Sequence, residues 1–226
     1  MKNLSSFILG LKFALSYFTI IPIKIKDSDD LSQNSVLSAT LFSLPLIGFI
    51  LGFITISLYG VLEHLSWFGA IICAISYMIL YGFIHTEAIM DVVDAIYAKH
   101  SGKDAYEVIK EPSVGAMGVL YAVSFMILKL AGIVYLFMNN YLYEFLTIVI
   151  ISRLMILIMI KKFKFKSSFV NVLKDSLHSK LLFISIVIFT ALNIYLSNES
   201  AIFLTIFALI FTIIISKFIE KNLLII

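Results

Sequence analysis

A series of long apolar runs, joined by short polar connections, constrains the fold of this chain more than any other feature. The runs lie at about Val36–Leu62, Trp67–Ile84, Gly115–Met138, Leu142–Ile160, Leu181–Leu196 and Ala201–Ser216. About 20 apolar residues are enough for a helix to cross a bilayer, and a helix satisfies its own backbone polar groups there. The sequence therefore predicts an all-α fold, a polytopic transmembrane helix bundle with about six spans.

Composition indicates the same fold class. The chain is 61% hydrophobic and only 14% charged, whereas a soluble domain averages about 25% charged residues. At ~20 residues per span, its 226 residues leave no room for a second soluble domain. We therefore expect one integral membrane domain over residues 1–226. The single cysteine, Cys73, lies in an apolar run and indicates neither a thiolate metal site nor cysteine catalysis.

The N-terminal segment differs from the six runs. From Phe7 to Pro22 it is apolar but short, and Lys12 interrupts it. Such a segment favours an interfacial or re-entrant helix over a span. We expect no cleaved signal peptide here, because a small-residue cleavage pattern is missing.

Basic residues predict the orientation of the bundle. Of the 17 Lys and Arg residues, only Lys129 and Arg153 lie inside the apolar runs; the others fall in the N-terminal segment or in alternate connections. The positive-inside rule then places both termini and the 85–114 loop in the cytoplasm. A lysine cluster over residues 161–180 is interpreted as an anchor of this kind or as an attractor of anionic lipid or substrate.

The stretch from His85 to Gly118 concentrates acidic residues between two apolar runs. Glu87, Asp91 and Asp94 are spaced i, i+4 and i+7, so they share one face of a helix. Carboxylates on one face repel each other unless a cation lies among them, and oxygen ligands suit Mg²⁺ first and Mn²⁺ next. Because Mg²⁺ commonly completes its shell with substrate phosphates, this face indicates phosphoryl or diphosphate chemistry. The alternative is a solvated acidic helix face.

Residues on either side of this face are further candidates. His85 could act as a base, a phosphate contact or a hydrogen-bonded structural residue. Gly115 and Gly118 open the next apolar run and allow backbone or a ligand to approach closely, and a helix N-terminus attracts phosphate. The alternative for the two glycines is helix packing through small residues.

Two cations lie within apolar runs, where a charge is costly and tends to face a polar interior. Arg153 is the only arginine in the chain, and we expect an anion or a carboxylate as its partner. Lys129 either shares that role or extends its amine to the membrane surface.

Together these residues resemble the cobalamin synthase family of membrane-bound adenosylcobinamide-GDP ribazoletransferases. Residues 85–95, HTEAIMDVVDA, match its His-x-Asp-Gly-x-x-Asp-x-x-Asp-Gly run, and residues 108–120, VIKEPSVGAMGVL, match a second run. Weaker matches are residues 18–22, residues 45–48, Lys129 and the pair Ser152 and Arg153. The chain differs from the family pattern at five positions. It has Glu87 and Glu111 where the pattern has Asp, and Ala88 and Ala95 where the pattern has Gly. It has Ser113 where the pattern has an arginine that would contact phosphate.

The resemblance implies that adenosylcobinamide-GDP and α-ribazole, or its 5′-phosphate, are joined to give adenosylcobalamin, or its 5′-phosphate, and GMP. It implies a bacterial cytoplasmic (inner) membrane, contact with membrane lipid and no nucleic acid partner, and it leaves a homo-oligomer open. The expected catalytic residues are His85, Glu87, Asp91 and Asp94, of which Glu87, Asp91 and Asp94 would hold Mg²⁺. The expected substrate or phosphate contacts are Lys110, Glu111, Gly115, Gly118, Lys129 and Arg153.

Three other functions are alternatives for a membrane protein with these residues. One is another Mg²⁺-dependent membrane phosphotransferase or prenyl transferase. The identity of its product would distinguish it from a ribazoletransferase. Another is a small ion-coupled transporter, whose critical charges should lie at mid-membrane rather than at the cytoplasmic rim. The last is a structural membrane protein without activity.

Overall fold

The computed structural model describes residues 2–84, 86–102, 104–110, 113–163 and 168–223, and every regular element in this part is helical. The elements are α1 Lys2–Phe18, α2 Asn34–Leu62, η1 Glu63–Leu65, α3 Trp67–Leu80, α4 Thr86–His100, α5 Ala105–Lys110, α6 Ala116–Met138, α7 Leu142–Lys162, α8 Ser168–Ser176, α9 Ser179–Ser197 and α10 Glu199–Leu223. Within these ranges α2, α6, α7, α9 and α10 are long and apolar enough to cross a membrane. The predicted fold class is thereby confirmed.

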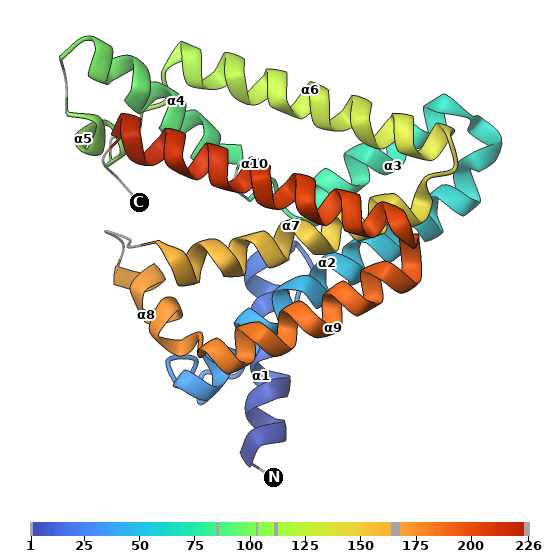
Figure 1. Ribbon diagram of the computed structural model, residues 1–226, viewed down its shortest axis with the longest axis horizontal. Coiled ribbons are helices and arrows are strands. Elements are labelled where there is room, and N and C mark those ends of the chain that lie inside the picture. The colour runs from blue at the N-terminus through green and yellow to red at the C-terminus, as the bar shows by residue number, and fades with distance from the viewer. Residues whose placement is uncertain (1, 85, 103, 111–112, 164–167, 224–226) are drawn as a thin grey trace.

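The second predicted span differs from the other five, because its helix ends early. α3 has 14 residues, about 21 Å of helix, which is short of the ~30 Å hydrocarbon layer. The chain then turns through Gly82 and Phe83, both in the left-handed region with φ of 64° and 51°. α4 begins at Thr86, so α3 and α4 follow one another along the length of α6 (Figure 1). The acidic face thus lies on the second half of a broken helix.

Two helices, α2 and α7, form the centre of the bundle and are the most buried of the five long helices. Glycines let them approach: a methyl group at Gly48 would lie 2.8 Å from the Val149 carbonyl oxygen, and one at Gly52 would lie 2.6 Å from Leu146 Cδ1. Small residues favour such close contacts between membrane helices. α6, α9 and α10 leave most of their apolar side chains outside the core, as expected for surfaces that face lipid.

The elements separate into two ends (Figure 1). The connections α2–α3, α6–α7 and α9–α10 lie at one end, and they carry no lysine or arginine. The other end is formed by α4, α5, α8 and the C-terminal part of α10, helices that carry Lys99, Lys110, Lys174, Lys217 and Lys221. The structure therefore gathers described lysines of four helices at one end of the bundle.

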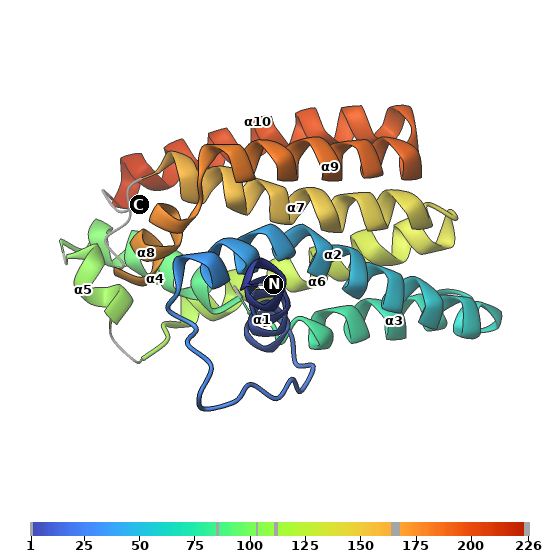
Figure 2. The same ribbon diagram turned by 90° about the horizontal axis from the view of Figure 1, so that it is seen from below.

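Helix α1 runs across the bundle rather than along it, and Figure 2 views it nearly end-on. It crosses α2 at Gly10, where a methyl group would lie 2.5 Å from Ala39 Cβ and 2.7 Å from the Val36 carbonyl oxygen. Thr40 Oγ1 donates a hydrogen bond to the Gly10 carbonyl oxygen at 3.2 Å. A helix of 17 residues lying across the spans agrees with the prediction of an interfacial or re-entrant segment.

Candidate functional site

Helix α4 carries Glu87, Asp91 and Asp94 from the break after α3 toward the lysine-rich end of the bundle. Glu87 is exposed, whereas Asp91 and Asp94 are half-buried. Glu87 and Asp94 are seven positions apart, which corresponds to about 10 Å along the helix axis. The three carboxylates therefore form a row rather than a tight cluster. Within the described ranges, no three His, Cys, Asp or Glu side chains gather closely enough to hold a metal ion by themselves.

Asp94 joins α4 to the start of α6. Its two carboxylate oxygens accept hydrogen bonds from the backbone N–H groups of Gly115 at 2.6 Å and Gly118 at 2.8 Å. Gly115 precedes α6, so Asp94 caps this helix from another element, and its charge also suits the helix dipole.

The two glycines permit this contact. A methyl group at either position would lie 2.5 Å from an Asp94 oxygen. The approach expected at Gly115 and Gly118 was that of backbone or a ligand, whereas the nearest group at both positions is the Asp94 side-chain carboxylate.

Negative charge accumulates around Asp91. Partial burial raises the pKa of this carboxyl group above its usual range, and the neighbouring carboxylates of Glu87 and Asp94 raise it further. A cation between these groups would remove the repulsion. Oxygen donors of this kind are suitable ligands for Mg²⁺, which needs only one or two protein carboxylates when substrate phosphates complete its shell.

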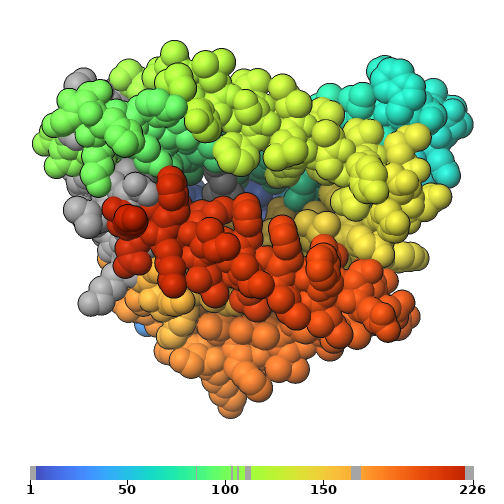
Figure 3. All heavy atoms as spheres, turned by 45° about the horizontal axis from the view of Figure 1, so that its top comes forward, coloured from blue at the N-terminus to red at the C-terminus, as the bar shows by residue number. Residues whose placement is uncertain are grey.

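A cavity of about 640 Å³ lies deeper in the bundle, lined by side chains from α1, α2, α3, α4, α6 and α7. The molecular surface is hollowed between α6 and α10 (Figure 3). Thr86 and Ile89, from the first turn of α4, are part of the cavity lining. The cavity therefore adjoins the helix end that carries Glu87.

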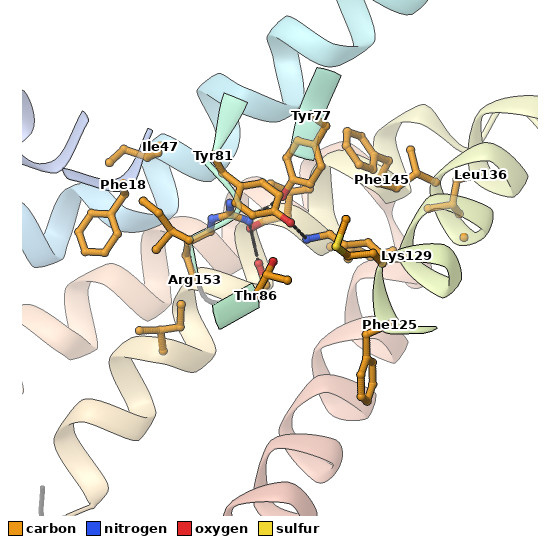
Figure 4. Close-up of a pocket in the computed structure, with 18 of the residues that line it drawn as sticks. Phe18, Ile47, Tyr77, Tyr81, Thr86, Phe125, Lys129, Leu136, Phe145 and Arg153 are labelled. Carbon is orange, nitrogen blue, oxygen red and sulfur yellow. Dashed lines mark hydrogen bonds between the residues drawn. The ribbon is translucent and has the colours of Figure 1, made fainter. Parts of the chain in front are cut away.

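Lys129 and Arg153 both line this cavity (Figure 4). Lys129 Nζ donates to the Tyr81 hydroxyl at 3.1 Å. Arg153 Nη1 donates to the Tyr77 hydroxyl, Ser152 Oγ and the Val149 carbonyl oxygen, each at 3.0 Å. In the described part of the chain, neither cation has a carboxylate partner. The expected anion for Arg153 is therefore not a protein carboxylate among these residues.

Sequence reasoning missed the two tyrosines that position the cations. Tyr77 lies in the last turn of α3 and Tyr81 directly follows that helix, and their ring centroids lie 5.4 Å apart. Two phenols at this spacing in an apolar run were a usable signal, since a buried hydroxyl needs a partner. The other predicted residues are less completely described: His85 and Glu111 lie outside the described residues, and only the backbone of Lys110 is described.

Comparison with known proteins identifies related sequences over most of the chain. A family model described as cobalamin-5-phosphate synthase matches residues 10–226. An adenosylcobinamide-GDP ribazoletransferase of Clostridium perfringens (strain SM101 / Type A) is 30% identical over 131 residues, which cover 56% of this chain and 50% of that protein. One of Clostridium botulinum (strain Eklund 17B / Type B) is 29% identical over 157 residues, covering 66% and 59%.

A third relative, from Chlorobium chlorochromatii (strain CaD3), bears the same name and is 30% identical over 127 residues, or 55% of this chain and 48% of that protein. The chain thus spans about half the length of the curated relatives that it matches. No solved structure matches it.

Proposed function

This chain belongs to the cobalamin-5-phosphate synthase family, and from that premise we propose that it is an adenosylcobinamide-GDP ribazoletransferase. It would join adenosylcobinamide-GDP to α-ribazole, or to its 5′-phosphate, and release GMP. The observation that carries the proposal is the match over residues 10–226, which includes the carboxylate helix α4 and both cavity cations. The same reaction is the one implied by the family resemblance, to which residues 85–120 contribute the most specific motifs.

The proposed chemistry is an in-line substitution at phosphorus. A ribazole hydroxyl attacks the phosphorus attached to cobinamide, a new oxygen–phosphorus bond forms, and the bond to GMP breaks. Either His85 or one carboxylate of α4 accepts the proton of the attacking hydroxyl. The remaining task of the protein is to hold both substrates in line and to balance the charge of the diphosphate.

Glu87, Asp91 and Asp94 are the proposed ligands of Mg²⁺. When bound, Mg²⁺ would neutralise charge on the diphosphate and on the leaving GMP. The shared face of α4 and the repulsion around Asp91 support this assignment. Asp94 could take part while it caps α6, because each carboxylate oxygen can accept more than one contact.

Six further residues are proposed to contact substrate or phosphate: Lys110, Glu111, Gly115, Gly118, Lys129 and Arg153. Support differs among them. Lys129 and Arg153 line a cavity, whereas the N–H groups of Gly115 and Gly118 are already bonded to Asp94.

We also propose one integral membrane domain in the bacterial cytoplasmic membrane, with both termini and the 85–114 loop in the cytoplasm. The grouping of described lysines of α4, α5, α8 and α10 at one end supports this orientation. A carboxylate row near that end would be accessible to cytosolic nucleotide substrates.

A product assay tests the proposal. Protein in nanodiscs is supplied with adenosylcobinamide-GDP and α-ribazole or α-ribazole 5′-phosphate, and GMP and the corrinoid product are followed by chromatography. We expect GMP and a cobalamin product in equal amounts, with EDTA stopping the reaction and Mg²⁺ restoring it. Folded protein that forms neither product from either nucleoside would refute the proposal and favour another membrane transferase.

A further inference from the structure

We propose that an open pocket of about 480 Å³ between α1, α2 and α9 binds one anionic phospholipid of the membrane, with the lipid phosphate at Lys180 and an acyl chain along α9. This lipid pocket is separate from the cavity that contains Lys129 and Arg153, and the two have no lining residue in common. The inference therefore goes beyond the proposed reaction and does not depend on it.

The first support is the polar part of the lipid pocket. His178 and Lys180, at the start of α9, line it together with Ser6 of α1 and Ser35 of α2. The two hydroxyl groups lie together, since Ser35 Oγ donates a hydrogen bond to Ser6 Oγ at 3.2 Å. Among the described residues that line the pocket, none is acidic. Donors with a positive charge suit a phosphate of net negative charge, whereas the ammonium group of phosphatidylethanolamine would find no carboxylate here.

The second support is the Lys180 amine, which differs from two other amines of the same lysine cluster. Lys161 Nζ donates to the Leu177 carbonyl oxygen at 2.7 Å. Lys174 Nζ donates to the Phe163 carbonyl oxygen at 2.6 Å. These two amines therefore satisfy carbonyl groups at helix ends. Among the described residues the Lys180 amine has no hydrogen-bond or ion-pair partner, so its charge is available to a ligand.

The third support is the apolar part of the lipid pocket. Phe42 of α2 and Ile184 of α9 line it. Ile184 also begins an exposed apolar strip of α9 that continues through Val187 and Ile188, which share its helix face. An acyl chain along this strip would run from Lys180 into the hydrocarbon layer. A soluble anion would fill only the polar part.

The fourth support is the position of the lipid pocket in the bundle. α9 begins directly after α8, one of the helices at the lysine-bearing end (Figure 1). α2 begins beside it, and Ser38 Oγ donates to the Ser176 carbonyl oxygen at 2.6 Å. A phospholipid with its headgroup here and its chain along α9 has the orientation of a lipid in the adjoining leaflet. Basic pockets between membrane helices are known to bind anionic headgroups.

A lipid titration tests the inference. Phosphatidylglycerol and phosphatidylethanolamine are added separately to protein in neutral detergent, and native mass spectrometry gives Kd for the first bound lipid. Wild-type protein should bind phosphatidylglycerol more tightly. Lys180→Gln should raise Kd for phosphatidylglycerol about tenfold, because it removes a charged hydrogen bond. Lys180→Arg keeps the charge and should keep the preference. Equal affinity of the wild-type protein for both lipids would refute the inference.

Lys162→Gln is the matched control. It makes the same change of charge in the last turn of α7, within the same lysine cluster but outside the residues that line the lipid pocket. Its Kd for phosphatidylglycerol should equal that of the wild type. Equal weakening by Lys162→Gln and Lys180→Gln would instead assign lipid binding to the lysine cluster as a whole and overturn the pocket site.

Two further measurements separate a lipid from a soluble phosphate and from a folding defect. Glycerol 3-phosphate, which has a phosphate but no acyl chain, should not displace bound phosphatidylglycerol. Displacement would refute the lipid assignment and favour a soluble phosphate ligand. Phosphatidylglycerol should raise the apparent Tm of the wild type more than that of Lys180→Gln, because a ligand stabilises the folded state that binds it. An equal rise in both proteins would contradict binding at Lys180.

Discussion

At the scale of single residues, Asp94 caps α6 and is also a proposed ligand of Mg²⁺. The sequence alone could not separate these two roles. Its spacing from Glu87 and Asp91 places it on the proposed metal-binding face, while its hydrogen bonds to Gly115 and Gly118 cap α6. A cap requires an acceptor oxygen, whereas a metal ligand of this type requires a charged carboxylate. The two duties therefore respond differently to substitution.

We expect Asp94→Ala to destabilise the protein by about 0.5–2 kcal/mol, the usual cost of losing a helix cap. Asp94→Asn should cost less stability than Asp94→Ala, because its one amide oxygen can still accept from Gly115 or Gly118, although its NH2 group cannot replace the second acceptor. It should lose turnover, because the proposed Mg²⁺ site requires a charged carboxylate. Apparent Tm and GMP release of each variant provide the two measurements. Asp27→Asn, in an exposed part of the 24–33 connection, controls for loss of a carboxylate. An unchanged Tm for Asp94→Ala would contradict the capping role.

Asp91 provides a sharper test of the catalytic face. Among the described residues its carboxylate caps no helix, and partial burial raises its pKa, as do the carboxylates of Glu87 and Asp94. Asp91→Ala should abolish GMP release while leaving membrane insertion and apparent Tm close to wild type. Activity and the gel-filtration profile in detergent are measured together. Near-normal turnover in folded Asp91→Ala protein would exclude this residue from the Mg²⁺ site.

At the scale of helices, contacts between α2 and α7 hold one of the cavity cations. Gly48 lies against the Val149 carbonyl oxygen, and its hypothetical methyl group would also come within 3.0 Å of Arg153 Cδ. Gly60, on the same helix, has nothing within 4 Å of the equivalent position. The two glycines therefore form a matched pair for substitution.

Gly60→Ala should raise stability by up to about 1 kcal/mol, because alanine favours a helix over glycine. Gly48→Ala gains the same propensity but forces apart two helix backbones, and overpacking typically costs about 1–3 kcal/mol. We expect its apparent Tm to be lower than that of Gly60→Ala by about 5 °C. Thermal unfolding in one detergent compares the variants. Equal Tm values would show that α2 can move away from α7 at little cost.

At the scale of the whole molecule, the two ends of the bundle differ in charge, and topology is the property to test. Cys73 is fully buried, so labelling of the wild-type chain by a membrane-impermeant maleimide should be negligible. New cysteines at His64 and Ser200, at the end without basic connections, should react from outside intact cells. Cysteines at Ser28 and His100 should react only after the cells are opened. The reverse pattern would overturn the proposed cytoplasmic site.

The sequence by itself determined the class of fold and the region of the site. Apolar length and composition indicated a membrane bundle, because these quantities depend only on local residues. The i, i+4, i+7 spacing likewise placed Glu87, Asp91 and Asp94 on one helix face. The short α1 and the end of α3 were harder to locate, since a few apolar residues more or less do not distinguish a span from a broken or interfacial helix.

Tertiary structure decided what those residues contact. No local pattern indicates that Asp94 would occupy the start of α6, because that contact joins residues 21 and 24 positions apart through the packing of α4 on α6. Nor does spacing alone bring Lys129 of α6 to the Tyr81 hydroxyl or Arg153 of α7 to the hydroxyl of the neighbouring Tyr77. The chemical groups of a site follow directly from the sequence. A cavity forms only where separate helices meet, so its position depends on how the helices pack.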